Sequence, residues 1–138
     1  MSWLYWALLS ALFAGLTAVL AKVGVKDIDS NLATAIRTTV ILVFAWSIAL
    51  FRNTQPFGTV TPRTWLFLVL SGLATGASWL CYFRALQLGE ASRVAPVDKL
   101  SVVVAMILAI LFLHQELKWQ HWVGGALIVS GTLILARG

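Results

Sequence analysis

The chain has 138 residues, of which 60% are hydrophobic and 11% are charged, and its mean hydropathy is +0.91. A soluble domain carries about 25% charged residues, so this composition cannot cover a water-exposed surface and excludes an ordinary soluble protein. The formal net charge of +5 would point to nucleic acid in a soluble protein. Here the basic residues stand near the ends of apolar runs, which indicates contact with anionic lipid headgroups and no nucleic-acid partner.

Five apolar runs follow one another along the chain, and each is long enough to cross a bilayer as a helix. A span needs about 20 mostly apolar residues, because the hydrocarbon core is about 30 Å thick and a helix rises about 1.5 Å per residue. We predict spans at about residues 3–21, 31–51, 64–83, 91–113 and 119–136. The runs do not alternate in polarity as the strands of a membrane barrel do. The predicted fold is an all-α membrane protein, a single domain over residues 1–138 with a bundle of five transmembrane helices.

The segments between these runs are short. Residues 52–63 contain Pro56, Gly58 and Pro62, which stop helices, and residues 84–93 are predicted to form a connector or a tight turn. An odd number of spans places the two termini on opposite sides of the membrane. Three Lys or Arg residues outside the spans then lie on the N-terminal side and five on the other side. This bias favours a cytoplasmic C-terminus, but it is small enough to allow insertion in both orientations.

Arg37 lies inside the second predicted span, where a charge is costly. Two interpretations remain open. The long side chain could reach back to the nearby interface, which is common for Arg and Lys near helix ends. Alternatively, the cation faces a polar cavity beside Thr34 and Thr38.

Asp98 and Lys99 follow Pro96 in the fourth predicted span. Proline fits the first turn of a helix and breaks a hydrogen bond elsewhere. The helix therefore either begins near Pro96, with Asp98 at its positive end, or begins near Ala91 and is broken at Pro96. In the second geometry Asp98, Lys99 and Ser101 would lie near a cavity, because broken helices with polar groups are a recurring form of transporter binding site.

Trp79 and Tyr82 lie near the end of the third predicted span, and Arg84 follows them. Aromatic rings at this position are typical of the belt at the headgroup level. The alternative interpretation is a stacking wall for a cation or a ring.

The chain lacks the sequence motifs of common catalytic sites. It has no phosphate-binding loop of an ATPase, no nucleophile elbow and no zinc-protease helix motif. His114, His121 and Glu116 flank the last predicted turn, but their spacing matches no strong metal-ligand pattern. We therefore expect neither an enzyme nor a metal or other cofactor, and no direct use of ATP.

Small residues gather in the fifth predicted span at Gly124, Gly125, Ser130 and Gly131. Small residues allow membrane helices to approach closely. Their density predicts that this span packs against protein, as a dimer interface. The alternative is the ordinary frequency of small residues in membrane helices.

Several segments together form a recognisable pattern. They are GLATGASWLCYFRAL at residues 72–86, APVDKLS at residues 95–101, Glu116, and GGALIVSG at residues 124–131. Their order and spacing resemble the EamA family of the drug/metabolite transporter superfamily, in particular its short, single-repeat branch. Full-length members of that family have ten helices in two five-helix repeats of inverted orientation, so the resemblance implies that this chain is equivalent to one repeat. One repeat cannot enclose a site between repeats, which implies a homodimer, with an antiparallel pair as one way to restore the inverted arrangement.

The first functional hypothesis is a gradient-driven carrier of small metabolites or amino acids in the cell membrane (inner or plasma), acting as a dimer of five-helix halves. The resemblance implies that the substrate cavity is lined by Lys22, Arg37, Trp79, Tyr82, Asp98 and Lys99. Arg37 and Lys99 would attract carboxylate or phosphate groups. The alternative is a non-transporting membrane subunit that scaffolds or modulates a partner protein. A membrane enzyme or an accessory to a lipid flippase is the least favoured hypothesis.

Overall fold

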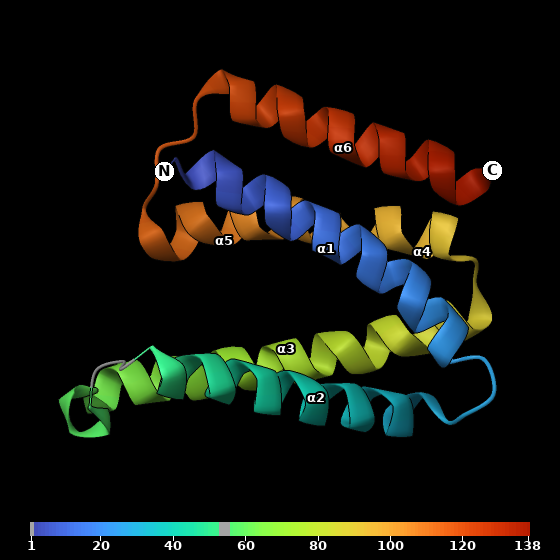
Figure 1. Cartoon of the computed structure of the whole chain (residues 1–138). Helices are drawn as coiled ribbons and strands as arrows, with labels where there is room; N and C mark the ends of the chain where they lie inside the picture. The colour runs from blue at the N-terminus through green and yellow to red at the C-terminus, as the bar shows by residue number, and fades with distance from the viewer. Residues whose placement is uncertain (1, 53–55) are drawn as a thin grey trace. The chain divides into compact units, whose positions relative to one another are not determined.

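The computed structural model describes residues 2–52 and 56–138. Figure 1 shows these residues as helices joined by short segments. The elements in chain order are α1 (Trp3–Gly24), α2 (Ser30–Phe51), the 3₁₀ helix η1 (Phe57–Thr59), α3 (Pro62–Leu88), α4 (Ala91–Asp98), α5 (Ser101–Leu113) and α6 (Trp119–Arg137). No strand occurs among the described residues, which confirms the prediction of an all-helical protein.

Four stretches are long and apolar enough to cross a membrane: Trp3–Gly24, Ser30–Phe51, Pro62–Leu88 and Ala91–Leu113. They correspond to the first four predicted spans, and the fourth consists of α4 and α5 together. The fifth predicted span is also helical, as α6, which has the polar residues Gln120 and His121 in its first turn. The protein is therefore a multi-pass membrane protein with four clear spans and a fifth helix.

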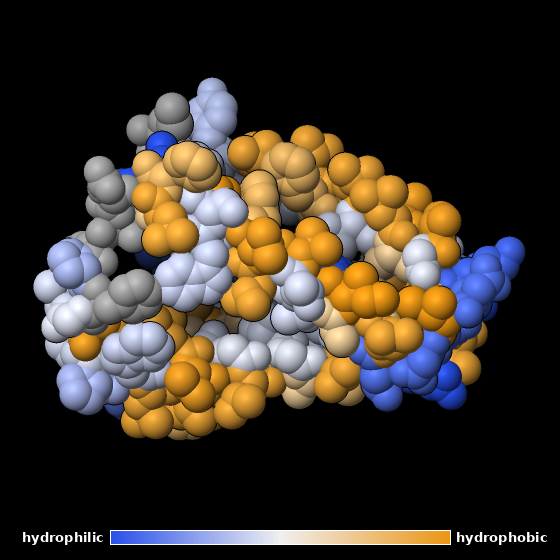
Figure 2. All heavy atoms as spheres, turned by 60° about the horizontal axis from the view of Figure 1, so that its bottom comes forward, coloured by the Kyte–Doolittle hydropathy of each residue, from blue (hydrophilic) through white to orange (hydrophobic). Residues whose placement is uncertain are grey.

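The apolar side chains lie mostly on the outside of the structure. At most 6% of the residues in the apolar 18-residue window of each span are buried, and hydrophobic residues cover a large part of the face shown in Figure 2. Exposed leucine, valine and phenylalanine would be costly in water but are compatible with lipid tails or with a second chain. The chain therefore has only a small core of its own.

The connector between the third and fourth spans is much shorter than the predicted residues 84–93. α3 continues to Leu88 and α4 begins at Ala91, so only two residues separate them. Tertiary contacts extend α3, because Leu86 is fully buried and the Gln87 side-chain amide donates to the carbonyls of Val25 (3.1 Å) and Ile28 (2.6 Å). These partners lie about 60 residues earlier in the chain, and the apolar pattern of α3 does not reveal them.

The helices fall into two compact units: unit 1, which comprises Met1–Lys22 and Leu88–Gly138, and unit 2, which comprises Val23–Gln87. In unit 2, α2 and α3 run antiparallel, side by side (Figure 1). Val25, Ala33, Phe83 and Leu86 are buried together near the start of α2 and the end of α3. In unit 1, α6 packs along α4 and also meets α5.

The start of α2 has a clear local cause. The Asp29 carboxylate accepts hydrogen bonds from the backbone N–H groups of Asn31 (2.9 Å) and Leu32 (3.1 Å). These are two of the donors that a helix leaves unsatisfied at its first turn. The negative charge also lies at the positive end of the helix dipole. Asp29 thus fixes where the loop ends and α2 begins.

Candidate functional site

The fourth span is broken eight residues after it begins. α4 ends at Asp98 and α5 begins at Ser101. At the break, the Lys99 N–H bonds to the carbonyl of Pro96 and the Leu100 N–H to the carbonyl of Val97, both at 3.0 Å. These bonds reach back three residues instead of four, so the chain tightens into a 3₁₀ turn. Of the two predicted geometries, the structure has the helix that begins at Ala91, with Pro96 inside it.

The break is supported by α6. The Leu100 N–H turns to Val97, so the Pro96 carbonyl accepts from the Lys99 N–H instead of its ordinary partner four residues later. The buried hydroxyl of Thr132 also donates to this carbonyl, at 3.2 Å. A carbonyl oxygen has two lone pairs, so it can accept both bonds. Sequence reasoning missed Thr132, since nothing in its local pattern distinguishes it from the other polar residues of α6.

Asp98 and Lys99 form an ion pair at the break. Lys99 Nζ lies 3.8 Å from Asp98 Oδ2, and the two side chains are 56% and 39% exposed, respectively. Ser101 is exposed at the start of α5. The break therefore brings both charges of the APVDKLS segment together on a surface that the chain does not cover.

Arg37 makes a different kind of contact, within unit 2. Its guanidinium carbon lies 4.6 Å from the centroid of the Trp79 ring and 5.2 Å from that of Phe83. Tyr82 is half-buried, and its ring meets Phe83 edge-on with centroids 6.5 Å apart. A stacking role for Trp79 was one of the two interpretations of the sequence, whereas Phe83 was not among the predicted site residues. Their spacing of four residues, which places both rings on one face of α3, was the available signal.

The depth of these rings argues against a guanidinium that reaches back to the interface. Arg37 is the eighth residue of α2, about 10 Å along the axis from the helix start. Trp79 lies nine residues before the end of α3 at Leu88, about 13 Å along that axis. The end of α3 lies beside the start of α2, because Gln87 bonds to the loop just before α2. A guanidinium that reached back to the interface would therefore lie level with residues 86–88. Contact with Trp79 keeps it at the depth of its own backbone.

The two helices that carry Arg37 and its rings contain no acidic residue. The five acidic residues are Asp27, Asp29, Glu90, Asp98 and Glu116, and none belongs to α2 or α3. Among the described residues, the Arg37 guanidinium forms no ion pair and donates no hydrogen bond. The hydroxyls of Thr34 and Thr38 donate to the carbonyls of Ser30 (2.8 Å) and Thr34 (2.7 Å), respectively.

The aromatic contacts cover only part of the guanidinium. An arginine at the centre of a span costs at least about 2.5–3.5 kcal/mol, and each of the two ring contacts of Arg37 offsets about 0.5–2 kcal/mol of that cost. A ring contact uses none of the N–H donors, which lie in the guanidinium plane. These donors can therefore take a further partner, such as water or an anion.

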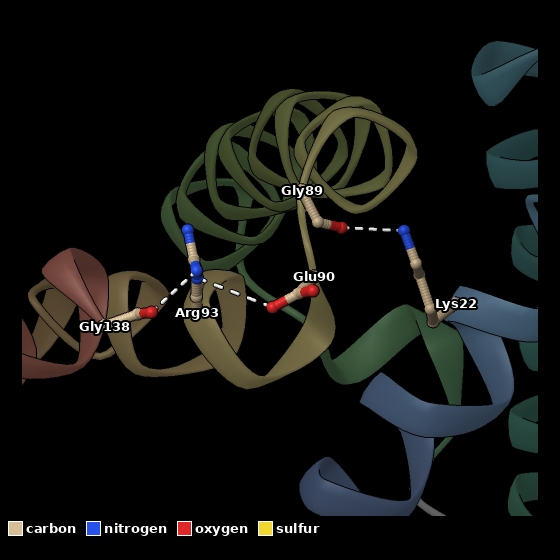
Figure 3. A network of polar contacts seen from close by, with 5 residues as sticks. All are labelled: Lys22, Gly89, Glu90, Arg93 and Gly138. Atoms are coloured by element: carbon tan, nitrogen blue, oxygen red, sulfur yellow. Dashed lines mark hydrogen bonds and ion pairs between the residues drawn. The ribbon is translucent and has the colours of Figure 1, made fainter.

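Lys22 has a structural partner at the end of α1. Its ammonium donates to the carbonyl of Gly89 at 2.7 Å (Figure 3). In the same view Arg93 lies between the carboxylate of Glu90, at 3.5 Å, and the carbonyl of Gly138, at 2.7 Å. These contacts join α1, the α3–α4 connector and the end of α6 within unit 1.

The small residues of α6 lie on two different surfaces of the helix. Gly125 is buried, and a Cβ built on it would lie 3.5 Å from the terminal methyl of Met106 on α5. A Cβ on Gly124 or Gly131 would meet nothing within 4 Å, and Ser130 is exposed. Gly125 therefore packs within the chain, whereas Gly124, Ser130 and Gly131 leave an open surface.

Comparison with known proteins links this chain to transport. The model of the EamA-like transporter family matches residues 1–137. The chain is 59% identical over 136 residues to "Uncharacterized transporter in cobO 3'region" from Sinorhizobium sp, covering 98% of this chain and 96% of that protein. No solved structure matches the chain.

More distant relatives are named as flippase subunits. The chain is 31% identical over 74 residues to "Probable 4-amino-4-deoxy-L-arabinose-phosphoundecaprenol flippase subunit ArnE" from Pseudomonas fluorescens, covering 53% of this chain and 62% of that protein. The protein of the same name from Aeromonas salmonicida is 29% identical over 69 residues, covering 50% of this chain and 60% of that protein. These names describe transport or flipping and name no catalytic activity.

Proposed function

This chain belongs to the EamA-like transporter family, and on that premise we propose that it is a gradient-driven carrier of a small metabolite, working as one five-helix half of a dimer in the cell membrane. The broken fourth span is the observation that supports this proposal most directly. Asp98 and Lys99 sit at the end of an eight-residue half-helix, about 12 Å into the span. Half-helices that end at polar groups deep in the bilayer are a recurring form of substrate site in transporters.

The exposure of this ion pair supports the dimer. An ion pair that faces lipid tails is costly, so it must face water or another protein surface. The described residues leave both side chains substantially exposed. A second copy that covers the break would enclose a polar path between the two halves. The open face of Gly124, Ser130 and Gly131 is our candidate for the contact between copies, and the near-balanced Lys and Arg distribution supports an antiparallel pair.

Uptake into proteoliposomes with an imposed proton gradient tests the proposal. A starting panel of radiolabelled glutamate, succinate, glycerol 3-phosphate and lysine covers both signs of charge. We expect at least one compound to accumulate above the level in empty liposomes. Asp98→Asn and Lys99→Met should each lower that uptake by about tenfold or more, the range expected when a hydrogen bond to a charged group is lost.

The loop before α2 provides matched controls. Lys26 and Asp27 are an exposed, adjacent pair of the same charges outside the spans. Lys26→Met and Asp27→Asn should leave uptake unchanged. If the break variants transport as well as the loop variants do, the break is not a substrate site, and a non-transporting membrane subunit becomes the better interpretation.

A second candidate is a subunit of a lipid-linked sugar flippase, which the sequence alone favoured least. It rests on the names of the ArnE relatives, which align with about half of this chain. A flippase subunit predicts that the chain alone takes up none of the soluble compounds in the panel. It also predicts that the chain gains activity only with a second membrane protein, which co-reconstitution with a second five-helix membrane protein would reveal.

A further inference from the structure

We propose that Arg37, stacked on Trp79 and Phe83, is an oxyanion-binding site, which takes a phosphate or carboxylate group at the depth of the spans. The inference deepens the proposed carrier function, on which it rests, because it assigns the substrate's anionic group to one residue. It starts from the isolation of this charge. α2 contains one charged residue, Arg37, and α3 contains only Arg63 and Arg84, so the two spans of unit 2 hold three cations and no anion.

The other cations in or beside the spans have partners or lie near helix ends. Lys99 is paired with Asp98, and Lys22 donates to the Gly89 carbonyl. Arg63 is the second residue of α3, and Arg84 near the other end of that helix donates to the Gln87 side chain at 3.0 Å. Arg37 is therefore the cation of the spans that is best placed to accept an external anion.

The geometry of the stack selects the kind of anion. Rings at 4.6 and 5.2 Å from the guanidinium carbon can cover its faces, while its N–H donors point outward in the guanidinium plane. That plane matches two oxygens of a carboxylate or phosphate, which can accept two parallel hydrogen bonds. Chloride accepts from one point and lacks this match. Arg37 is half-buried, so part of the residue is accessible.

Nearby hydroxyls leave the site without an anionic competitor. Thr34 and Thr38 donate their hydroxyl hydrogens to backbone carbonyls. The Asp29 carboxylate is held eight residues earlier by two backbone N–H groups. An oxyanion that enters would meet the charge of Arg37, and neither α2 nor α3 contains an acidic residue that would oppose it.

Anion titration of the full chain in dodecyl maltoside micelles tests the inference. Sodium phosphate or sodium acetate would replace sodium chloride at constant ionic strength, and tryptophan emission and the unfolding temperature would be recorded. We expect saturable binding of phosphate or acetate relative to chloride. Arg37→Gln should weaken it by about 10- to 100-fold, the loss expected for hydrogen bonds to a charged group. Arg37→Lys should bind with intermediate affinity, because it keeps the charge and loses the bidentate geometry.

Arg63→Gln is the matched control. Arg63 also lies over an aromatic ring, at 5.9 Å from Phe67, but near the helix start. The Arg63→Gln protein should bind phosphate and acetate as the unmodified chain does. Trp79→Phe should abolish the emission change while the unfolding temperature still responds, which assigns the signal to this stack.

The source of the oxyanion is distinguished by a second arm with dioleoyl phosphatidic acid added to the micelles. Saturation by inorganic phosphate or acetate indicates a soluble substrate group, and saturation by the lipid alone indicates a headgroup; both depend on Arg37 if the inference is right. If the unmodified chain shows no saturable response to phosphate, acetate or the lipid, the inference is wrong. It is also wrong if the Arg37→Gln protein binds these anions as tightly as the unmodified chain does. Binding in micelles needs no transport, so binding at Arg37 without uptake would refute the carrier and leave the anion site intact.

Discussion

The two units of the chain deal with polar groups in a membrane in opposite ways. In unit 1 the polar groups of the broken span have partners within the unit, because Asp98 pairs with Lys99 and the Thr132 hydroxyl donates a hydrogen bond to the Pro96 carbonyl. In unit 2 a small buried apolar cluster holds the helices together at one end, and Arg37 is left stacked on rings with no anion. The difference indicates a division of roles: unit 1 stabilises a backbone irregularity, and unit 2 presents an unpaired charge.

The largest expected effect tests whether unit 2 depends on its buried cluster. Leu86 is fully buried, whereas Leu73 on the same helix is 67% exposed. Leu86→Ala should lower the free energy of unfolding by about 2–4 kcal/mol, because it leaves a cavity that the helices cannot refill. Leu73→Ala should change it by less than about 1 kcal/mol, since its side chain contacts mostly lipid or detergent. Equal losses in a chemical unfolding series in micelles would show that unit 2 has no core of its own.

The next effect tests whether the Arg37 charge is unpaired. Ile41 lies one helical turn after Arg37 and is half-buried, so Ile41→Glu would supply an internal partner at the favourable spacing of four residues. We expect phosphate binding to fall by about tenfold, which corresponds to about 1.4 kcal/mol. Leu42→Glu adds the same charge about 100° around the helix and should have a smaller effect. If both variants bind phosphate as the unmodified chain does, Arg37 is not the anion site.

The smallest effect concerns the cap on the broken span. Thr132→Val removes the hydroxyl that reaches Pro96 from α6. Hydrogen bonds between membrane helices contribute about 0.6 kcal/mol on average and at most about 1.7 kcal/mol, so we expect a loss of stability of about 1 kcal/mol in the same unfolding series. Thr75→Val is the control, because the exposed Thr75 hydroxyl bonds only to the carbonyl of Ser71 in its own helix. Thr132→Ser should restore the stability; a loss equal to that of valine would assign the effect to packing.

Much of the architecture was predictable because it follows from local composition. The four clear spans coincide with apolar runs of about 20 residues, which a bilayer requires whatever the tertiary arrangement. The start of α2 was predicted within one residue, since Asp29 caps it locally. The end of α3 was not, because Gln87 finds its partners in the loop before α2. The predicted site residues Arg37 and Trp79 do meet.

The sequence by itself determined that this protein is helical, that it lies in a membrane and that it resembles the EamA family, because hydrophobic length and the order of motifs are properties of the chain. Only the tertiary structure decided which polar residues have partners. Asp98 and Lys99 are adjacent in the sequence, but only the structure shows that their charged groups lie 3.8 Å apart at the break in the fourth span. The same pattern of charge in apolar sequence left Arg37 ambiguous, until contact between α2 and α3 held its guanidinium at depth against Trp79 and Phe83. Hydrophobicity is summed along a sequence, whereas the partner of a charge depends on which helix lies beside it.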